Sequence, residues 1–376
     1  MKITKFFTLL CAVATLFAAC EPVDDNTNNP GGNTDKPGTG DQPTVTEITL
    51  TADKYVAMIG EVVSFTVTDS TGNNLTADSK VFNKATYTEV TNPFIPTEDG
   101  SLEFYAVYGT TISKTIKVDV VPAVPELPAD SDPSNTSFNH RILLVDHTGT
   151  KCGWCPTMMK ELRVVEADEN YHNKFYEAMS HTYNSDDPSW SRSAEVVTSH
   201  YGSLVNGYPS LTFNFYYPRT ADRSASDIMA QIDALWKAEG ADAGITAAAT
   251  GGNTQVVVKT GVKANVTGDY RVTAWLLEDG IYAPQAGTSD ESYYTHNNSI
   301  RYIASSNPIT GFDLGTIEAG QSTEYTMSLE ISSSKWNKDN LKVLVIVSGL
   351  NDSNRYDVVN LAMCPVNGSV EYDYMK

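Results

Sequence analysis

Hydrophobic and polar positions follow three different patterns along this chain of 376 residues. Residues 46–121 contain short runs in which apolar and polar side chains alternate, such as Val62–Thr68, Leu102–Val107 and Ile112–Val120. Alternation with a period of two, interrupted by frequent turn residues, is typical of strands with one buried face. This pattern predicts a small β-sandwich over residues 46–121.

The segment between residues 138 and 240 combines strand and helix signals. Arg141–Val145 is a continuous apolar run, as expected for a buried strand. Apolar side chains between Met158 and Val165 then recur at helical spacing. Further strand and helix signals follow at Phe175–Met179, Ala194–Tyr201, Ser210–Phe215 and Ile228–Trp236. The order β-α-β-α-β-α predicts an α/β domain over 138–240.

The last part of the chain, residues 241–376, returns to a strand pattern without an evident repeat of the first one. The strand candidates are Gln255–Val262, Tyr270–Leu277, Thr323–Ile331, Leu341–Ser348 and Val358–Met363. We therefore predict a C-terminal β-sandwich domain over 241–376.

The first 19 residues have the layout of an export signal. Lys2 and Lys5 precede a mostly apolar stretch, Phe6–Phe17, and the small residues Ala18-Ala19 stand directly before Cys20. This segment resembles a bacterial lipoprotein signal. The resemblance implies that residues 1–19 are a signal peptide and that Cys20 carries the lipid anchor.

Two further segments lack the apolar residues that a core needs. Residues 20–45 consist mainly of Asn, Gly, Pro, Thr and Asp, which predicts a flexible tether. Residues 122–137 contain four prolines, which predicts a semi-rigid linker. The chain thus divides into a signal, a tether, a β-sandwich, a linker, an α/β domain and a second β-sandwich.

The charge of the chain limits its partners. With 26 Lys and Arg against 46 Asp and Glu, the formal net charge is −20. Such a chain is repelled by phosphate backbones and by anionic lipid headgroups, so we expect no nucleic-acid partner. No stretch after residue 20 approaches the ~20 apolar residues that span a bilayer.

The sharpest chemical signal is Cys152-Gly153-Trp154-Cys155-Pro156, between a predicted strand and a predicted helix. A cysteine at a helix N-terminus has a lowered pKa, which favours the reactive thiolate. Cys152 would then attack a disulfide, and Cys155 would resolve the mixed disulfide. A static disulfide and half of a zinc site are the alternatives. Zinc would need a second Cys or His pair at short spacing, which the sequence lacks, so we expect neither metal nor cofactor.

Two other features resemble thioredoxin-like proteins. Asp146 ends the strand before the cysteines, and Gly207-Tyr208-Pro209 precedes a later strand. The resemblance implies that Asp146 relays a proton to the cysteine pair and that a cis-proline loop faces it. Tyr208 and Pro209, together with Trp154, would bind a peptide substrate. Asp146 as an ordinary strand-end carboxylate, and a trans bond before Pro209, remain the alternatives.

A wider resemblance covers about residues 138–370. It rests on Asp146-His147-Thr148-Gly149 before the cysteine pair, and on Leu276–Ile281 with Gln285, His296-Asn297 and Arg301 downstream. These motifs resemble the "outer membrane protein twenty-eight" related family of Bacteroidetes lipoproteins. The resemblance implies a lipid-anchored outer membrane protein that is exposed at the cell surface.

Taken together, these patterns predict a multidomain α+β protein. Its parts would be an N-terminal immunoglobulin-like β-sandwich, a central thioredoxin-like α/β domain and a C-terminal β-sandwich. The intact cysteine pair favours thiol–disulfide exchange on exported protein or peptide thiols. The alternative is a surface binding or scaffold lipoprotein for a protein or glycan ligand, in which the thioredoxin-like domain is structural.

Overall fold

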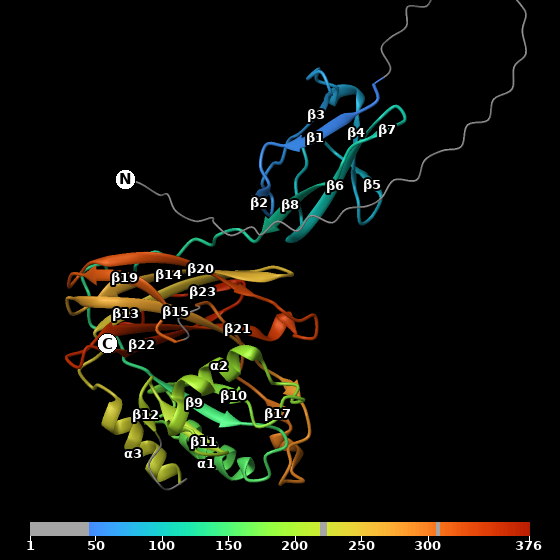
Figure 1. The fold of residues 1–376 in the computed structure, drawn as a ribbon. Helices are drawn as coiled ribbons and strands as arrows, with labels where there is room; N and C mark the ends of the chain where they lie inside the picture. Colours follow the sequence, from blue (N-terminus) through green and yellow to red (C-terminus); the bar gives the residue numbers. More distant parts are fainter. Residues whose placement is uncertain (1–44, 219–223, 306–308) are drawn as a thin grey trace, which may run out of the picture. The chain divides into compact units, whose positions relative to one another are not determined.

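The computed structural model describes residues 45–218, 224–305 and 309–376 (Figure 1). The predicted signal peptide, Cys20 and nearly all of the predicted tether lie outside the described residues. Their predicted roles therefore stay predictions.

The N-terminal part consists of two sheets that share one core. A pair of antiparallel strands forms the smaller sheet: β1 (Ile48–Ala52) and β3 (Phe65–Asp69). The larger sheet contains β2 (Val56–Met58), β8 (Ile116–Val121), β6 (Gly100–Tyr108), β4 (Lys80–Asn83), β5 (Thr88–Val90) and β7 (Thr111–Ile112). Alternating apolar side chains from both sheets meet in this core, as when Phe65 packs on Phe104 with ring centroids 4.9 Å apart.

A nine-stranded mixed sheet organises the rest of the chain. Its continuous order is β12 (Tyr217–Pro218), β11 (Ser210–Phe213), β9 (Ile142–Thr148), β10 (Phe175–His181), β18 (Ser299–Ile303), β15 (Gly268–Glu278), β21 (Leu341–Leu350) and β22 (Tyr356–Pro365), with β19 (Phe312–Ile317) also paired to β15. The join lies at β10, which pairs with β9 on one side and with β18 on the other.

This join corrects the predicted fold class. The prediction of a central thioredoxin-like α/β domain, followed by a separate C-terminal β-sandwich, is wrong. Strands β9, β10, β11 and β12 are part of a larger sheet whose other strands come from beyond residue 267, and most of the regular structure is β. The edge of β10 is occupied by β18, a partner that lies more than a hundred residues away and that a local pattern cannot reveal.

Three α-helices in the described part of the chain pack on this sheet: α1 (Cys155–Ala167), α2 (Arg192–Tyr201) and α3 (Ala225–Leu235). Strand β9 is buried on both faces: Ile142 and Leu144 pack with α1 and α3, and Leu143 and Val145 pack with α2. That double burial explains the continuous apolar run in its sequence.

The same double burial continues in β15 and β21. On one face, Trp275 and Leu344 join the core under α2. On the other face, Leu276 and Val343 pack with a four-stranded sheet. That sheet contains β20 (Ser322–Glu330), β14 (Gln255–Ala264), β13 (Ala243–Gly251) and β23 (Gly368–Val370).

The remaining elements are short. A hairpin of two-residue strands, β16 (Ile281–Tyr282) and β17 (Thr295–His296), leaves the end of β15 and returns to β18. Single 3-10 turns occur at Thr76–Asp78, Gly202–Leu204, Glu291–Tyr293 and Lys338–Asn340. The segment Ile281–His296, which we name the covering hairpin, positions the site described next.

Candidate functional site

The two cysteines occupy the turn between β9 and α1 and form a disulfide with an S–S distance of 2.05 Å. The helix begins at Cys155, one turn later than the sequence suggests, and Pro156 fills its first turn, where a missing N–H costs nothing. Cys152 lies in the preceding turn, and its backbone N–H donates to the Gly149 carbonyl at 3.0 Å. The predicted activation of Cys152 by the helix terminus stays a prediction.

Both cysteines are buried. Cys152 is 1% exposed and Cys155 is 0% exposed, whereas Trp154 between them is 71% exposed. The turn therefore presents an indole ring to solvent and keeps its sulfur atoms inside.

The covering hairpin, more than 130 residues further along the chain, forms hydrogen bonds with this turn. The Gln285 side chain donates from Nε2 to the carbonyl of Gly149 at 3.2 Å and to that of Cys152 at 3.0 Å. The backbone N–H of Ala286 donates to the Thr150 carbonyl at 2.7 Å. Hydrogen bonds to the peptide groups on both sides of the first cysteine hold the CxxC turn in place.

Gly287 brings the two backbones into direct contact. It has a φ of +86°, and a Cβ built on it would lie 2.0 Å from the Gly153 carbonyl oxygen. Only glycine fits there, because any side chain would push the covering hairpin away from the CxxC turn.

Asp146 lies fully buried in β9, opposite Met179 of β10 and Leu211 of β11. Neither of its carboxylate oxygens has a hydrogen-bond partner among the residues that the structure describes. Burial raises the pKa of Asp146 to about 7, because an apolar interior disfavours the charged form. The carboxyl can therefore take up and release a proton near neutral pH.

Tyr208 and Pro209 stand at the start of the strand next to the one that carries Asp146. The peptide bond between them is cis. The Tyr208 hydroxyl lies 2.9 Å from the Thr182 hydroxyl, and its ring meets the ring of Tyr183 edge to face at 5.4 Å. The sheet thus brings Asp146 and Pro209 onto neighbouring strands, while Trp154 points into solvent.

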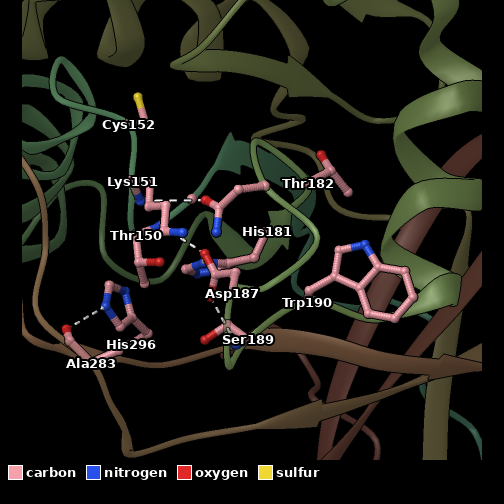
Figure 2. Close-up of polar contacts among 12 residues, drawn as sticks. Thr150, Lys151, Cys152, His181, Thr182, Asp187, Ser189, Trp190, Ala283 and His296 are labelled. Carbon is pink, nitrogen blue, oxygen red and sulfur yellow. Dashed lines mark hydrogen bonds and ion pairs between the residues drawn. The ribbon is translucent and has the colours of Figure 1, made fainter.

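A buried polar network, which sequence reasoning missed, lies beneath the covering hairpin (Figure 2). Asp187 is its centre: the carboxylate accepts the backbone N–H of Thr150 at 2.6 Å and that of Ser189 at 2.8 Å, and it lies 3.1 Å from His181 Nδ1. Burial opposes the charge of Asp187, but these hydrogen bonds and the His181 charge hold its pKa well below the ordinary value.

Two histidines connect this network to the covering hairpin. The rings of His181 and His296 meet edge to face at 5.0 Å, and His296 Nε2 lies 3.1 Å from the Ala283 carbonyl oxygen. Burial, with a contribution from His181, lowers the pKa of His296 to about 4, so this ring is neutral at physiological pH. No group of three or more Cys, His, Asp and Glu side chains within 45–218, 224–305 and 309–376 is arranged to hold a metal ion.

A buried ion pair lies at the base of the covering hairpin. Arg301 Nε of β18 donates to Glu278 Oε2 of β15 at 2.6 Å, and both side chains are almost fully buried. The family resemblance already singles out Glu278, Gln285, His296 and Arg301, but without roles. Their positions give those roles: Gln285 and His296 belong to the covering hairpin, and Glu278 with Arg301 joins two strands at its base. The sequence offers no comparable signal for the roles of His181 and Asp187.

The fold and the site define a strand-rich protein with a buried disulfide. The disulfide lies at the start of α1, under the covering hairpin. Within this chain, residues 196–368 match the family model of the outer membrane protein Omp28. The resemblance to that family is thereby confirmed over these residues, and the match assigns the chain to the outer membrane. In the described part of the chain, no helix has the length and apolar character that crossing a bilayer requires.

Comparison with solved structures concerns the fold alone. HBP35 of Porphyromonas gingivalis is similar with a TM-score of 0.51 and 18% identity, over 62% of this chain and 77% of that chain. A protein from Corynebacterium diphtheriae has a TM-score of 0.22 and 11% identity, over 88% of this chain and 59% of that chain. This TM-score is too low to show a shared fold. No curated protein matches the sequence.

Proposed function

We propose that this chain is a lipid-anchored surface protein of the outer membrane that binds a ligand outside the cell, and that its cysteine pair is a structural disulfide. The observation that carries the proposal is the burial of both cysteines under the covering hairpin. An exchange enzyme needs a sulfur that a partner thiolate can approach in line, whereas a buried disulfide resists attack.

Under this proposal, Gln285 protects the disulfide by holding the covering hairpin on the CxxC turn. Gln285→Ala removes two hydrogen bonds from the CxxC turn, each contributing about 0.5–1.5 kcal/mol. We expect the native disulfide to be reduced by dithiothreitol about tenfold faster in this variant, because local opening of the hairpin becomes easier. The rate is measured by alkylating the released thiols at timed intervals and counting them by mass spectrometry.

Gln321→Ala, which changes an exposed glutamine far along the chain, is the matched control and should leave the rate unchanged. Equal and fast reduction of wild type and Gln285→Ala would contradict the structural role, because it would mean that the hairpin does not protect the sulfurs.

The anchor is tested through Cys20. Cys20→Ser removes the acylated residue, so the protein should leave the outer membrane fraction or remain unprocessed. Cys11→Ser changes a cysteine within the same signal and should leave the protein in the membrane after a carbonate wash. Retention of Cys20→Ser in the washed outer membrane would refute the lipid anchor.

Thiol–disulfide exchange is the second candidate function, and Asp146 is the specific observation in its favour. A carboxyl with a pKa of about 7, six residues before Cys152 in the sequence, suits a proton relay. In this case Cys152 would attack, Cys155 would resolve, and Trp154, Tyr208 and Pro209 would hold the peptide. Mixed disulfides with exported proteins that accumulate in Cys155→Ser, but not in Cys152→Ser, would decide for this candidate.

A further inference from the structure

A cleft of about 1010 Å³ opens beside the covering hairpin. Four segments line it: the loop before α2, the end of β15 with β16, β18, and the loop that leads into β21. Its aromatic members are Trp190, Tyr282, Tyr302 and Trp336, its cationic members are Arg192, Arg301 and Lys335, and its acidic members are Asp186, Asp187 and Glu278. We name it the tryptophan cleft. Its volume reaches the upper end of the ~300–1,000 Å³ that small-molecule sites occupy.

The rings give the tryptophan cleft flat, amphipathic walls. Tyr282 is 66% exposed, and the two tryptophans and Tyr302 are partly exposed, so each presents part of its ring to the cleft. Aromatic faces pack well against flat apolar surfaces and keep a polar edge for solvent or a hydrogen bond. The C–H faces of sugar rings are surfaces of this kind.

Two exposed cations, Arg192 and Lys335, line the cleft, although the chain as a whole is strongly acidic. Lys335 is exposed and forms no ion pair with any residue within the described ranges. The Arg192 side chain is 81% exposed and is paired only with Glu195, three residues along α2. The carboxylates of the lining are already engaged: Asp186 with Lys151, Asp187 with His181 and the backbone N–H of Thr150, and Glu278 with Arg301. The exposed Lys335 therefore favours a negatively charged ligand.

A buried ion pair holds both tryptophan-bearing loops. Arg301 donates from Nη1 to the Trp190 carbonyl at 3.2 Å, and its guanidinium lies 5.5 Å from the centre of the Trp336 ring. Its partner Glu278 accepts the backbone N–H of Asn337 at 2.8 Å through Oε1. The desolvation of a buried ion pair often exceeds its Coulombic gain, so this pair is better explained by the positioning of the two loops than by stability alone.

From this geometry we propose that the tryptophan cleft binds an acidic saccharide, a sugar chain that carries carboxylate groups. The rings hold the sugar faces, Lys335 and Arg192 recognise the carboxylate, and short polar side chains such as Ser185 and Ser332 face the hydroxyls. This inference rests on the proposed function, since it names the ligand class of the surface binding protein. An acidic peptide is the competing occupant, but it would use neither the flat ring faces nor the small hydroxyl groups as fully.

The test uses the full mature chain, purified in detergent, on an array of saccharides that end in uronic or sialic acid. Each acidic saccharide is paired with its neutral counterpart, and a hexaglutamate peptide is included. We expect binding of at least one acidic saccharide over its neutral partner, with an affinity that falls as salt rises. Titration calorimetry then measures the affinity for the best array ligand.

Two variants locate the ligand. Trp336→Ala should weaken binding about tenfold or more through loss of the ring face. Lys335→Ala, at an exposed position where folding is not at risk, should weaken it several-fold and reduce its salt dependence. Tyr55→Ala and Lys160→Ala are the controls, because they remove an exposed aromatic ring and an exposed lysine outside the cleft.

Three outcomes would overturn the inference: no acidic saccharide binds, the hexaglutamate peptide alone binds, or binding is unaffected by both cleft variants. None of these outcomes touches the lipid anchor or the protection of the disulfide. The failure of this inference is therefore distinguishable from the failure of the proposed function.

Discussion

Arg301→Met is expected to lower the free energy of unfolding by about 3–5 kcal/mol, because it leaves the Glu278 carboxylate buried without its counter-charge. The methionine fills much of the same volume, so the loss comes from the charge and not from a cavity. A double variant, Arg301→Met with Glu278→Gln, should recover part of the loss, since it removes the unpaired charge as well.

Urea unfolding followed by tryptophan fluorescence measures this effect. All five tryptophans lie at or beyond residue 154, so the signal reports the part of the chain that contains the ion pair and not the N-terminal sheets. Lys151→Met breaks an exposed ion pair with Asp186 in the same part of the chain and is the control, with an expected change below about 1 kcal/mol. A loss of similar size in both single variants would show that burial of the Arg301 pair has no special weight.

Asp146→Asn is expected to remove a pH-dependent loss of stability. In the native protein the pKa of Asp146 is raised from 3.8 to about 7, so the folded state holds its proton more tightly than the unfolded state does. The resulting stabilisation is present at low pH and disappears as the pH rises through about 7. Between pH 5 and pH 8 the wild type should lose about 2–3 kcal/mol through this group, and Asp146→Asn should not.

The comparison needs unfolding curves of both proteins at the two pH values. The buried asparagine lacks partners as the aspartic acid does, so the decisive quantity is the change between pH 5 and pH 8 and not the stability at one pH. Asp352→Asn, which neutralises an exposed carboxylate, should follow the wild type. A pH profile of Asp146→Asn that parallels the wild type would contradict the raised pKa.

Local patterns predicted many single elements of the fold but not how they combine. The run Arg141–Val145 lies largely in β9, and the apolar positions after Met158 lie in α1, because both signals reflect burial of nearby side chains. The thioredoxin-like domain was the wrong assembly of these elements, because the pairing of β10 with β18 depends on a strand far along the chain.

Several strands escaped the pattern, and for two of them the reason can be identified. Strand β13 is rich in alanine, which is depleted in strands, and its Gly244 leaves room for the Phe138 ring. Strand β18 carries Arg301 among its buried positions, and a buried arginine looks exposed until its partner Glu278 is known. Both strands depend on contacts that no window of sequence contains.

For the candidate site, the sequence identified several of the residues but not their burial or their contacts. The spacing of Cys152 and Cys155 identified the residues, and the family resemblance pointed to Gln285 and Arg301. The burial of the cysteines could not be foreseen, since Gln285 lies 133 residues after the carbonyl group that it contacts. Asp187 has no sequence signal that sets it apart from other acidic residues, and its neighbour His181 became relevant only through a 3.1 Å contact.

The covering hairpin also imposes an order on maturation. A polypeptide delivered from its N-terminus presents both cysteines well before Ile281–His296 has emerged, so an oxidant meets them while they are still open. Closure of the hairpin then separates the new bond from the reductants and thiols of the surroundings. We therefore expect oxidation to precede burial, so that the finished protein keeps a bond that it could no longer easily form.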